Sequence, residues 1–214
     1  MKLVEELRDL KSNNLIITGD GSNEFHIMKE LCKKYNGHNK LLWFPRTPLL
    51  IKKGLCALDT IKIYLNNQIF GINSIIYLVD GEYIEEDAIN EIQDHLNSIG
   101  VNIIDVSPIN EAFAIRCISG NYEVILYCIV SGTETCIEEE IAKLIDLEYG
   151  VKINLSGDRD SGWKTRIKKE IRQILKGRNK NLEELIRNAE KSKLERSFPN
   201  ICAVLRRIEE SFQF

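Results

Sequence analysis

The residues best suited to chemistry lie where a buried strand is expected to end. The run Ser74–Val79 is almost wholly apolar and rich in branched side chains, and Asp80, Gly81 and Glu82 follow it directly. Such a run is typical of a strand covered on both faces of a sheet. In open α/β sheets ligands bind beyond the carboxyl ends of the strands, and a glycine lets the backbone turn there. Asp80 and Glu82 are thus placed to face one point, or Asp80 instead caps the following helix.

A second acidic turn follows the expected first core strand, Asn14–Thr18. Asp20 lies in this turn and Glu24 lies just after it. If the two strands are neighbours, carboxylates from both turns converge. Converging carboxylates repel each other unless they share a cation, and hard oxygen ligands suit Mg²⁺ or Mn²⁺. A further acid is available from Glu134 or Glu138, at the start of a later helix.

The turn after the first strand only partly matches the dinucleotide-binding pattern G-x-G-x-x-G. Gly19 and Gly21 occupy the first two glycine positions, but Glu24 occupies the third. The second strand ends in Trp43, Phe44 and Pro45 rather than in the acid that would hold a ribose hydroxyl. A dinucleotide site is therefore disfavoured, and the chain has no P-loop motif.

The composition is that of an ordinary globular protein of 214 residues, with 43% hydrophobic and 29% charged residues. No apolar run approaches the length of a membrane span, and the N-terminus resembles a charged amphipathic helix rather than a signal peptide. We therefore expect a cytoplasmic protein with no membrane partner. The six cysteines lack zinc-ligand spacing and lie mostly among apolar neighbours, so we expect reduced core residues.

Apolar periodicity and turn residues predict strands and helices in alternation, which favours a parallel sheet covered on both faces. The expected strands are 14–18, 41–44, 74–79 and 101–106, followed by a hairpin of 111–118 and 122–130. The expected helices are 1–10, 22–36, 50–65, 85–99, 135–148, 163–175, 182–193 and 199–212. Thr135 and Glu138 have capping-box spacing, as do Asn181 and Glu184.

Charge is distributed unevenly along the chain. Residues 1–150 hold 13 Lys and Arg against 23 Asp and Glu, whereas residues 151–214 hold 16 against 9. The segment 163–180 is the most basic, with Glu170 as its single acid. Its apolar residues share one helical face, so we expect the cations to point outward. Such a face contacts nucleic acid, docks on an acidic surface, or is simply solvated.

The order of these parts resembles the Toprim domain, which occurs in topoisomerases, primases, small ribonucleases and nucleases of the overcoming-lysogenization-defect group. The resemblance covers roughly residues 13–107 and is nearest to small standalone Toprim-like proteins. It implies a Mg²⁺ site for phosphoryl transfer, formed by a glutamate after the first strand and a D-x-D pair. Asp80-Gly81-Glu82 matches that pair. Thr18 stands where the glutamate belongs, so Asp20 or Glu24 would have to replace it.

We therefore expect an α/β fold with a mainly parallel Toprim- or Rossmann-like sheet, helices on both faces and a helical C-terminal extension. Residues 1–150 would form the Toprim-like domain, with a hairpin insertion near 111–130, and residues 151–214 the basic extension. The expected activity is Mg²⁺-dependent hydrolysis of nucleic-acid phosphodiesters. The alternative is a non-catalytic module that binds nucleic acid or protein and has lost the glutamate at Thr18.

Each role has candidate residues, and the oligomeric state stays open. The catalytic candidates are Asp80, Glu82 and Glu24. The candidate ligands of Mg²⁺ or Mn²⁺ are Asp20, Asp80, Glu82 and Glu138. The candidates for nucleic-acid binding are Lys164, Lys168, Lys169, Arg172 and Lys176.

Overall fold

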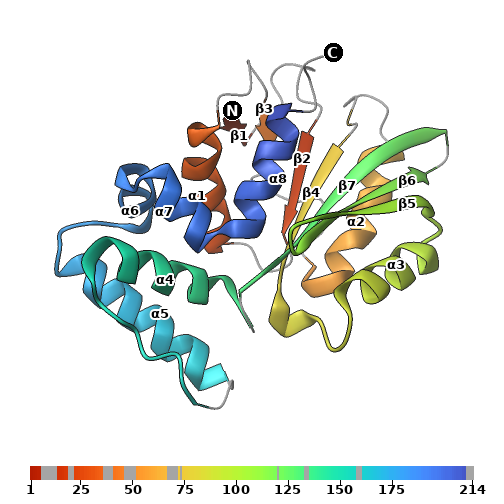
Figure 1. The fold of residues 1–214 in the computed structure, drawn as a ribbon. Coiled ribbons are helices and arrows are strands. Elements are labelled where there is room, and N and C mark those ends of the chain that lie inside the picture. Colours follow the sequence, from red (N-terminus) through yellow and green to blue (C-terminus); the bar gives the residue numbers. More distant parts are fainter. Residues whose placement is uncertain are drawn as a thin grey trace.

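The computed structural model has an α/β architecture in three layers, with a central sheet between two layers of helices (Figure 1). It describes residues 1–5, 14–18, 22–35, 41–45, 52–66, 72, 74–119, 121–132, 135–157 and 161–210. The predicted α/β class is confirmed. No helix of these residues is long and apolar enough to cross a membrane.

The described strands form a seven-stranded sheet in the order β1-β3-β2-β4-β7-β6-β5. The neighbouring strands β1, β3, β2, β4 and β7 pair in parallel, whereas β7 with β6 and β6 with β5 pair antiparallel. The sheet is therefore mixed, where a mainly parallel one was expected. The strands are β1 (Lys2–Val4), β2 (Asn14–Thr18), β3 (Leu41–Trp43), β4 (Ser74–Asp80), β5 (Asn102–Ile109), β6 (Ala112–Ser119) and β7 (Tyr122–Ser131).

The two apolar runs singled out in the sequence, β2 and β4, are adjacent strands in the middle of the sheet, as predicted. All seven residues of β4 are buried. Successive side chains point to opposite faces, so Ile76 and Leu78 join one hydrophobic cluster while Ile75 and Tyr77 join the other. Because β4 is a central strand, Asp80 at its carboxyl end lies midway along the side of the sheet where the parallel strands end.

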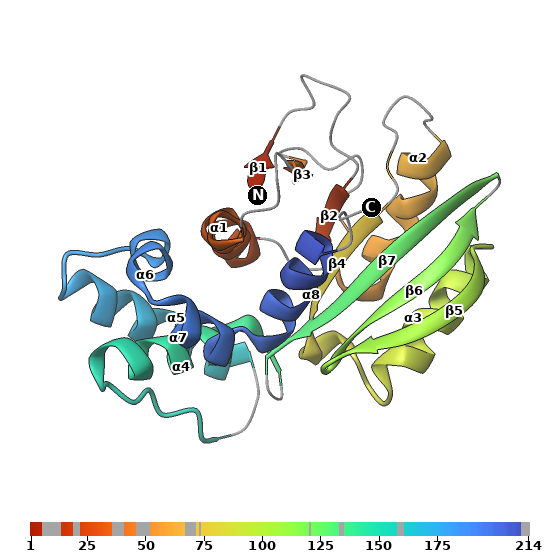
Figure 2. The same cartoon turned by 45° about the horizontal axis from the view of Figure 1, so that its top comes forward.

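The helices divide between the two faces of the sheet. On one face, a 3₁₀ helix (Gly54–Asp59), α2 (Thr60–Asn66) and α3 (Ala88–Ser98) cover the sheet. The other face holds the remaining helices, which are α1 (Ser22–Leu31), α4 (Ile137–Tyr149), α5 (Ser161–Lys176), α6 (Leu182–Asn188), α7 (Lys191–Ser197) and α8 (Pro199–Glu210). In Figure 2, α8 lies along the sheet while α4 and α5 extend away from it.

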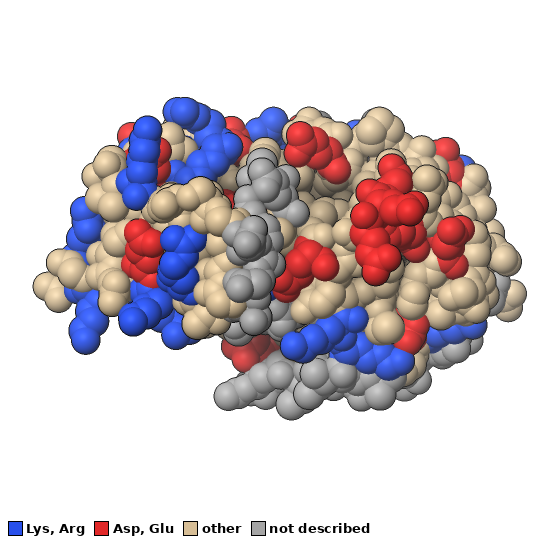
Figure 3. Space-filling view, turned by 90° about the horizontal axis from the view of Figure 1, so that it is seen from below, with Lys and Arg blue, Asp and Glu red and all other residues tan. Residues whose placement is uncertain are grey.

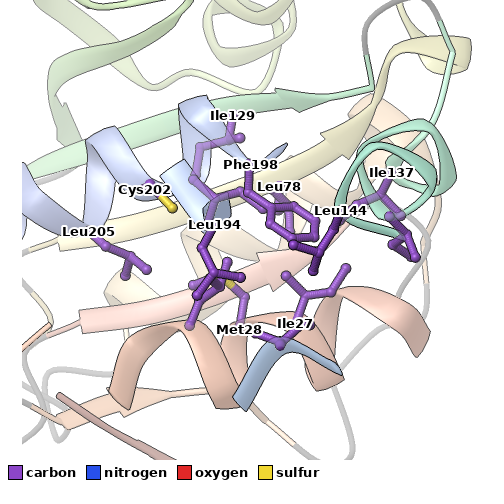
Figure 4. Packing of buried hydrophobic residues seen from close by; sticks show 14 of the residues in the cluster. Ile27, Met28, Leu78, Ile129, Ile137, Leu144, Leu194, Phe198, Cys202 and Leu205 are labelled. Atoms are coloured by element: carbon purple, nitrogen blue, oxygen red, sulfur yellow. The ribbon is translucent and has the colours of Figure 1, made fainter. Parts of the chain in front are cut away.

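Residues on both sides of position 150 share one hydrophobic cluster. Phe198 is fully buried between α7 and α8, and Figure 4 shows its ring among Leu78, Leu144 and Leu194. These neighbours come from β4, α4 and α7 respectively. The C-terminal helices are thus packed into the same core as the central strands.

Two predictions for the sheet edges are wrong. Lys2–Val4 is a strand, not part of a helix, because it pairs in parallel with β3. Residues 6–10 of that predicted helix lie outside the described residues. The expected fourth strand became β5, which pairs antiparallel with β6 at the sheet edge. Asn110 and Glu111 form the two-residue turn between β5 and β6, and Asn110 has a positive φ of 56°.

The hairpin expected at 111–130 forms, as β6 and β7. Its second strand pairs with β4 inside the sheet. Two predicted helices are interrupted: the segment 54–66 begins as a 3₁₀ helix, and the segment 182–197 breaks at Ala189, which leaves α6 and α7. Ala189 has extended backbone angles, and its buried side chain joins the core.

All six cysteines are free thiols in the structure, in agreement with the prediction that they are reduced. Five are buried and Cys56 is exposed. Burial raises the pKa of the Cys117 thiol to about 11 and that of Cys202 to about 12. These buried thiols serve as small apolar core groups, and their pKa values disfavour the reactive thiolate.

The packing of Phe198 makes a stability prediction. Phe198→Ala should lower the free energy of unfolding by about 3–5 kcal/mol, because it removes a buried ring that joins three elements. Ile104→Ala is the control, since Ile104 is 44% exposed, and it should cost less than about 1 kcal/mol. Urea unfolding followed by circular dichroism measures both. Equal losses would show that the C-terminal helices do not depend on this core.

Candidate functional site

Asp80 joins the end of β4 to the start of α4. Its Oδ1 accepts a hydrogen bond of 3.0 Å from the backbone N of Ile137, the first residue of α4. The positive end of the helix dipole favours a carboxylate at this position. Asp80 therefore caps a helix, but one that begins 57 residues later and not the next helix in the chain. That next helix, α3, is capped by Asp87, whose side chain accepts from the backbone N of Asn90.

The turn that leads from β7 into α4 requires glycine at position 132. Gly132 has a φ of +87°, and a Cβ there would lie 2.4 Å from the backbone N of Cys136. Such an approach is incompatible with any side chain. The close turn brings the first N–H groups of α4 back toward the end of β4. In addition, the backbone N of Glu82 donates to the carbonyl of Thr135 over 2.7 Å, so the segment after β4 is joined directly to the residues that precede α4.

Lys164 of α5 holds the two carboxylates that the sequence singled out. Its Nζ donates to Asp80 Oδ2 at 2.8 Å and to Glu82 Oε1 at 2.7 Å. The Lys164 side chain is 15% exposed and that of Asp80 is 1% exposed, so this contact is largely shielded from water. The expectation that the cations of this helix point outward is wrong for Lys164. Lys164 lies in the first turn of α5, so this N-terminal part of the helix is the part that contacts the carboxyl end of β4.

Glu138 forms a second buried acidic position, beside the first. Its Oε1 accepts from Asn23 Nδ2 at 2.7 Å and lies 3.4 Å from Lys168 Nζ. Its Oε2 is buried and has no hydrogen-bond partner among the described residues. Burial and the neighbouring Glu138 carboxylate raise the pKa of the Cys136 thiol, which is a weak donor. Glu138 is therefore only half satisfied by strong donors.

Two further carboxylates lie in the first turn of α4, and the sequence reasoning missed both. Glu139 accepts from the hydroxyl of Thr135 at 2.8 Å. This contact replaces the predicted capping box of Thr135 with Glu138, and the N-cap residue is Cys136. Burial raises the pKa of Glu140 to about 8, while a hydrogen bond from the backbone of Gly132 lowers it. The run Glu138–Glu140 was a visible signal, because three acids at a helix start complement its dipole.

The Asp80–Lys164 pair is ionised at neutral pH. Burial raises the pKa of Asp80 to about 6, while hydrogen bonding and charge attraction from Lys164 lower it. Burial lowers the pKa of Lys164, but its hydrogen bonds to Asp80 and Glu82 outweigh that effect and raise it above its usual value. We therefore assign a protonated Lys164 and a charged Asp80 at pH 7. The acidic position already contains a bound cation, supplied by the chain itself.

The other predicted site residues are placed unevenly. Glu24 lies in the first turn of α1 and is buried, next to Asn23, which reaches Glu138. Thr18 ends β2 with no acid at its position. Asp20 and Glu134 lie outside the described residues. Within the described ranges, no group of three or more His, Cys, Asp or Glu is arranged to hold a metal ion.

Lys168 pairs with Glu138, and the outward face of α5 carries the other predicted cations. Lys168, Arg172 and Lys176 are spaced four residues apart and form one stripe, about 6 Å between successive Cα levels. Lys169 lies beside them, and Lys169, Arg172 and Lys176 are exposed. None of these three forms an ion pair within the described part of the chain. The stripe and its neighbours line a shallow groove of about 430 Å³.

Figure 3 shows the resulting separation of charge on one face of the molecule. Lys and Arg are most numerous at the left, on the side of α4 and α5, with a second group along the lower right, and the largest patch of Asp and Glu lies at the right, on the side of α3. The acids near α3 include the exposed Glu85, Glu86 and Asp87. A polyanion that approaches this face is attracted to the α5 side and repelled from the α3 side.

The pKa of Asp80 makes a prediction about pH. Because that pKa is about 6 in the folded state, against 3.8 ordinarily, the folded state binds more protons between these values. Stability therefore falls as pH rises through this window. Asp80→Asn lacks the titrating group, so from pH 4 to pH 7 its unfolding free energy should gain about 2 kcal/mol relative to the wild type. Urea unfolding in EDTA measures the difference.

Lys164→Met is the partner variant for this measurement. The Lys164 ammonium lowers the pKa of Asp80, so its removal raises that pKa further. The loss of stability should then continue to higher pH than in the wild type. If the difference between the wild type and Asp80→Asn stays constant from pH 4 to pH 7, the carboxyl does not titrate as described.

Comparisons of this chain with protein-family models, with characterised proteins and with solved structures find no match. Two features of the described residues bear on function. One is the buried pair of Asp80 and Glu82 with Lys164, and the other is the exposed basic face of α5.

Proposed function

We propose that this protein is a non-catalytic nucleic-acid-binding module that contacts phosphates through the outward face of α5. The observation that carries the proposal is the exposed group of Lys169, Arg172 and Lys176 on this face. Exposed cations along one helix face neutralise successive phosphates and release counterions, whatever the base sequence. The acidic surface near α3 repels the same polyanion, so it would steer a nucleic acid toward α5.

The non-catalytic assignment is supported by the position of Lys164. Its ammonium lies within 2.8 Å of both Asp80 and Glu82, where a catalytic cation would have to bind. Breaking a buried ion pair costs about 3–5 kcal/mol, so a metal would have to supply at least that much to displace it. Thr18, in place of the glutamate that the Toprim resemblance implies, agrees with a lost activity.

A second candidate function is Mg²⁺-dependent hydrolysis of nucleic-acid phosphodiesters. One observation favours it: Asp80 and Glu82 converge on a single cationic group, as the ligands of one ion must. Mg²⁺ binds through one or two carboxylates plus water and substrate phosphates, so this pair suffices as a protein anchor. Asp80 and Glu82 would hold the ion after Lys164 withdrew, and the ion would stabilise charge on the phosphate.

The binding proposal is tested by removing three exposed cations. Lys169→Gln, Arg172→Gln and Lys176→Gln, combined in one protein, should weaken binding to all oligonucleotides alike. The slope of log affinity against log salt should flatten by about two to three units, at about 0.7–0.9 per lost phosphate contact. Fluorescence anisotropy with single- and double-stranded DNA and RNA at several salt concentrations measures both.

The control has the same change in net charge at another surface. Lys152, Arg196 and Arg207 are exposed and lie off α5, so their combined replacement by Gln should leave the affinity and its salt slope nearly unchanged. Equal weakening by the two triple variants would show that net charge alone matters. An unchanged affinity in the α5 variant would mean that this face is only solvated.

The two candidate functions separate in a cleavage assay with Mg²⁺ or Mn²⁺. The leading proposal predicts intact labelled oligonucleotide on denaturing gels, with or without the metal. Metal-dependent cleavage that Asp80→Asn abolishes would overturn it in favour of the hydrolase. Asp80→Asn suits this assay because asparagine keeps the size of the side chain and its amide oxygen still accepts from the backbone N of Ile137, and thermal melting shows whether the variant is folded.

A further inference from the structure

A pocket of about 370 Å³ lies beside the stripe on α5, where α1, α4, α5 and the start of α6 meet. Its volume is within the range of about 300–1,000 Å³ that is usual for small-molecule sites. It is distinct from the outward groove, although Lys168, Arg172 and Lys176 border both. The chemistry of its lining changes from the buried side to the exposed side.

The interior of the pocket is aliphatic. Ile141, Ile171 and Leu175 are 1%, 6% and 5% exposed, and the half-buried Leu182 adds to the same wall. Among the described lining residues, Glu138 is the one buried polar side chain. The body of a ligand that fills this interior must therefore have few polar atoms, because polar atoms would lose water there without gaining partners.

The carboxylate of Glu138 is not available to a ligand. Its Oε1 accepts from Asn23 Nδ2 at 2.7 Å and lies 3.4 Å from Lys168 Nζ, and its Oε2 is buried. Glu138 and Lys168 balance each other's charge. The remaining charges of the lining then decide which head group the pocket favours.

The mouth of the pocket is positively charged. Arg172 and Lys176 are exposed lining residues, and neither forms an ion pair within the described part of the chain. Lys180 adds a third positive charge to the lining. The lining thus has three cations beyond the pair of Lys168 with Glu138. Guanidinium and ammonium groups donate strong hydrogen bonds to carboxylates and phosphates, so the mouth favours an anionic head group.

We propose that this pocket binds an aliphatic anion such as a medium-chain fatty acid. Its hydrocarbon chain would lie on Ile141, Ile171 and Leu175, and its head group would accept from Arg172 and Lys176. A nucleotide fits less well, because the polar edge of its base would face aliphatic walls. Inorganic phosphate would leave the interior unused. This site goes beyond the proposed nucleic-acid binding and does not depend on it.

The chain length of the ligand tests the aliphatic interior. Octanoate should bind more tightly than hexanoate by about fourfold for each added methylene group, since each one is removed from water. Isothermal titration calorimetry on the full chain measures the dissociation constants. Equal affinities would show that the chain does not enter the pocket.

The head group of the ligand tests the positive mouth. Octanoate should bind about tenfold or more tightly than 1-octanol, which has the same chain without a charge, because it accepts charge-assisted hydrogen bonds. Octyl phosphate is the second anion in this test, because a phosphate also suits the two cations. The tighter binder of the two anions identifies the head group as a carboxylate or a phosphate monoester.

Leu182→Trp separates the pocket from the outward face of α5. Leu182 lines the pocket but not the groove, so the added bulk should abolish octanoate binding and leave oligonucleotide binding unchanged. Ile104→Trp is the matched control, because Ile104 is exposed on β5 and does not line the pocket. It should leave octanoate binding unchanged.

A double variant tests the two cations at the mouth. Arg172→Gln combined with Lys176→Gln should weaken octanoate binding about tenfold or more and leave 1-octanol binding unchanged. Lys152→Gln combined with Arg207→Gln makes the same change in net charge away from the pocket, on exposed residues. This control should keep the affinity for octanoate.

The wild-type measurements decide first. The pocket proposal is overturned if neither octanoate nor octyl phosphate binds, or if neither binds more tightly than 1-octanol, whatever the oligonucleotide results. Anion binding that survives in folded Leu182→Trp also overturns it, because the ligand then lies elsewhere. Thermal melting shows whether that variant is folded. If it is not, the double variant of exposed cations decides, and an unchanged affinity there overturns the proposal. Loss of oligonucleotide binding alone leaves it intact.

Discussion

The carboxylate of Asp80 is the interaction on which the rest of the site depends. It accepts one hydrogen bond from the start of α4 and one from Lys164 of α5, which lie 57 and 84 residues away in sequence. These two contacts fix β4, α4 and α5 to one another at the carboxyl end of the central strand. A buried carboxylate is tolerated only when its charge is balanced by hydrogen bonds and an opposite charge, and Asp80 has both. The same two contacts fix where the outward face of α5 points.

The uneven charge of the chain has two structural consequences. Part of the basic C-terminal segment docks on acids of the first 150 residues, as Lys164 does on Asp80, Arg187 on Glu30 and Lys193 on Glu148. The reverse pairing also occurs, between Glu183 and both Lys29 and His26. Three further cations, Lys169, Arg172 and Lys176, lie exposed on the outer face of α5. A helix whose first turns are anchored by ion pairs presents its later cations in a fixed orientation.

The sequence predicted those parts of the fold that depend on local pattern. The apolar runs of β2 and β4, the amphipathic helices α3 and α5, and the capping box of Asn181 with Glu184 are all present. Sheet order was less accessible, because β1 and β5 take their places through pairing with distant strands or through an Asn-Glu turn that carries no strong signal. Tertiary pairing overrides local helical spacing at Leu3 and Val4.

The candidate site was predictable in its residues but not in its partners. A strand end followed by Asp80 and Glu82 has a recognisable pattern, and so does a run of cations at helical spacing. That Lys164 turns inward and binds the first pair depends on the packing of α5, which no local pattern encodes. Asn23 gave no signal at all, since its role depends on the approach of α1 to α4. Charge pairs between distant segments are set by topology, and topology is the part that a single sequence specifies least directly.

Two buried acids at the start of α4 are satisfied to different degrees. Asp80 has a donor for each oxygen, so its contacts account for its burial without a ligand. Glu138 lies one residue beyond Ile137, in the same turn of α4, yet only its Oε1 has donors. Folding alone would favour an apolar residue at such a position, because a half-satisfied carboxylate is less stable than a hydrocarbon of the same size. The donors that Glu138 does have come from α1 and α5, so its carboxylate links these helices to α4 and leaves one buried oxygen without a strong donor.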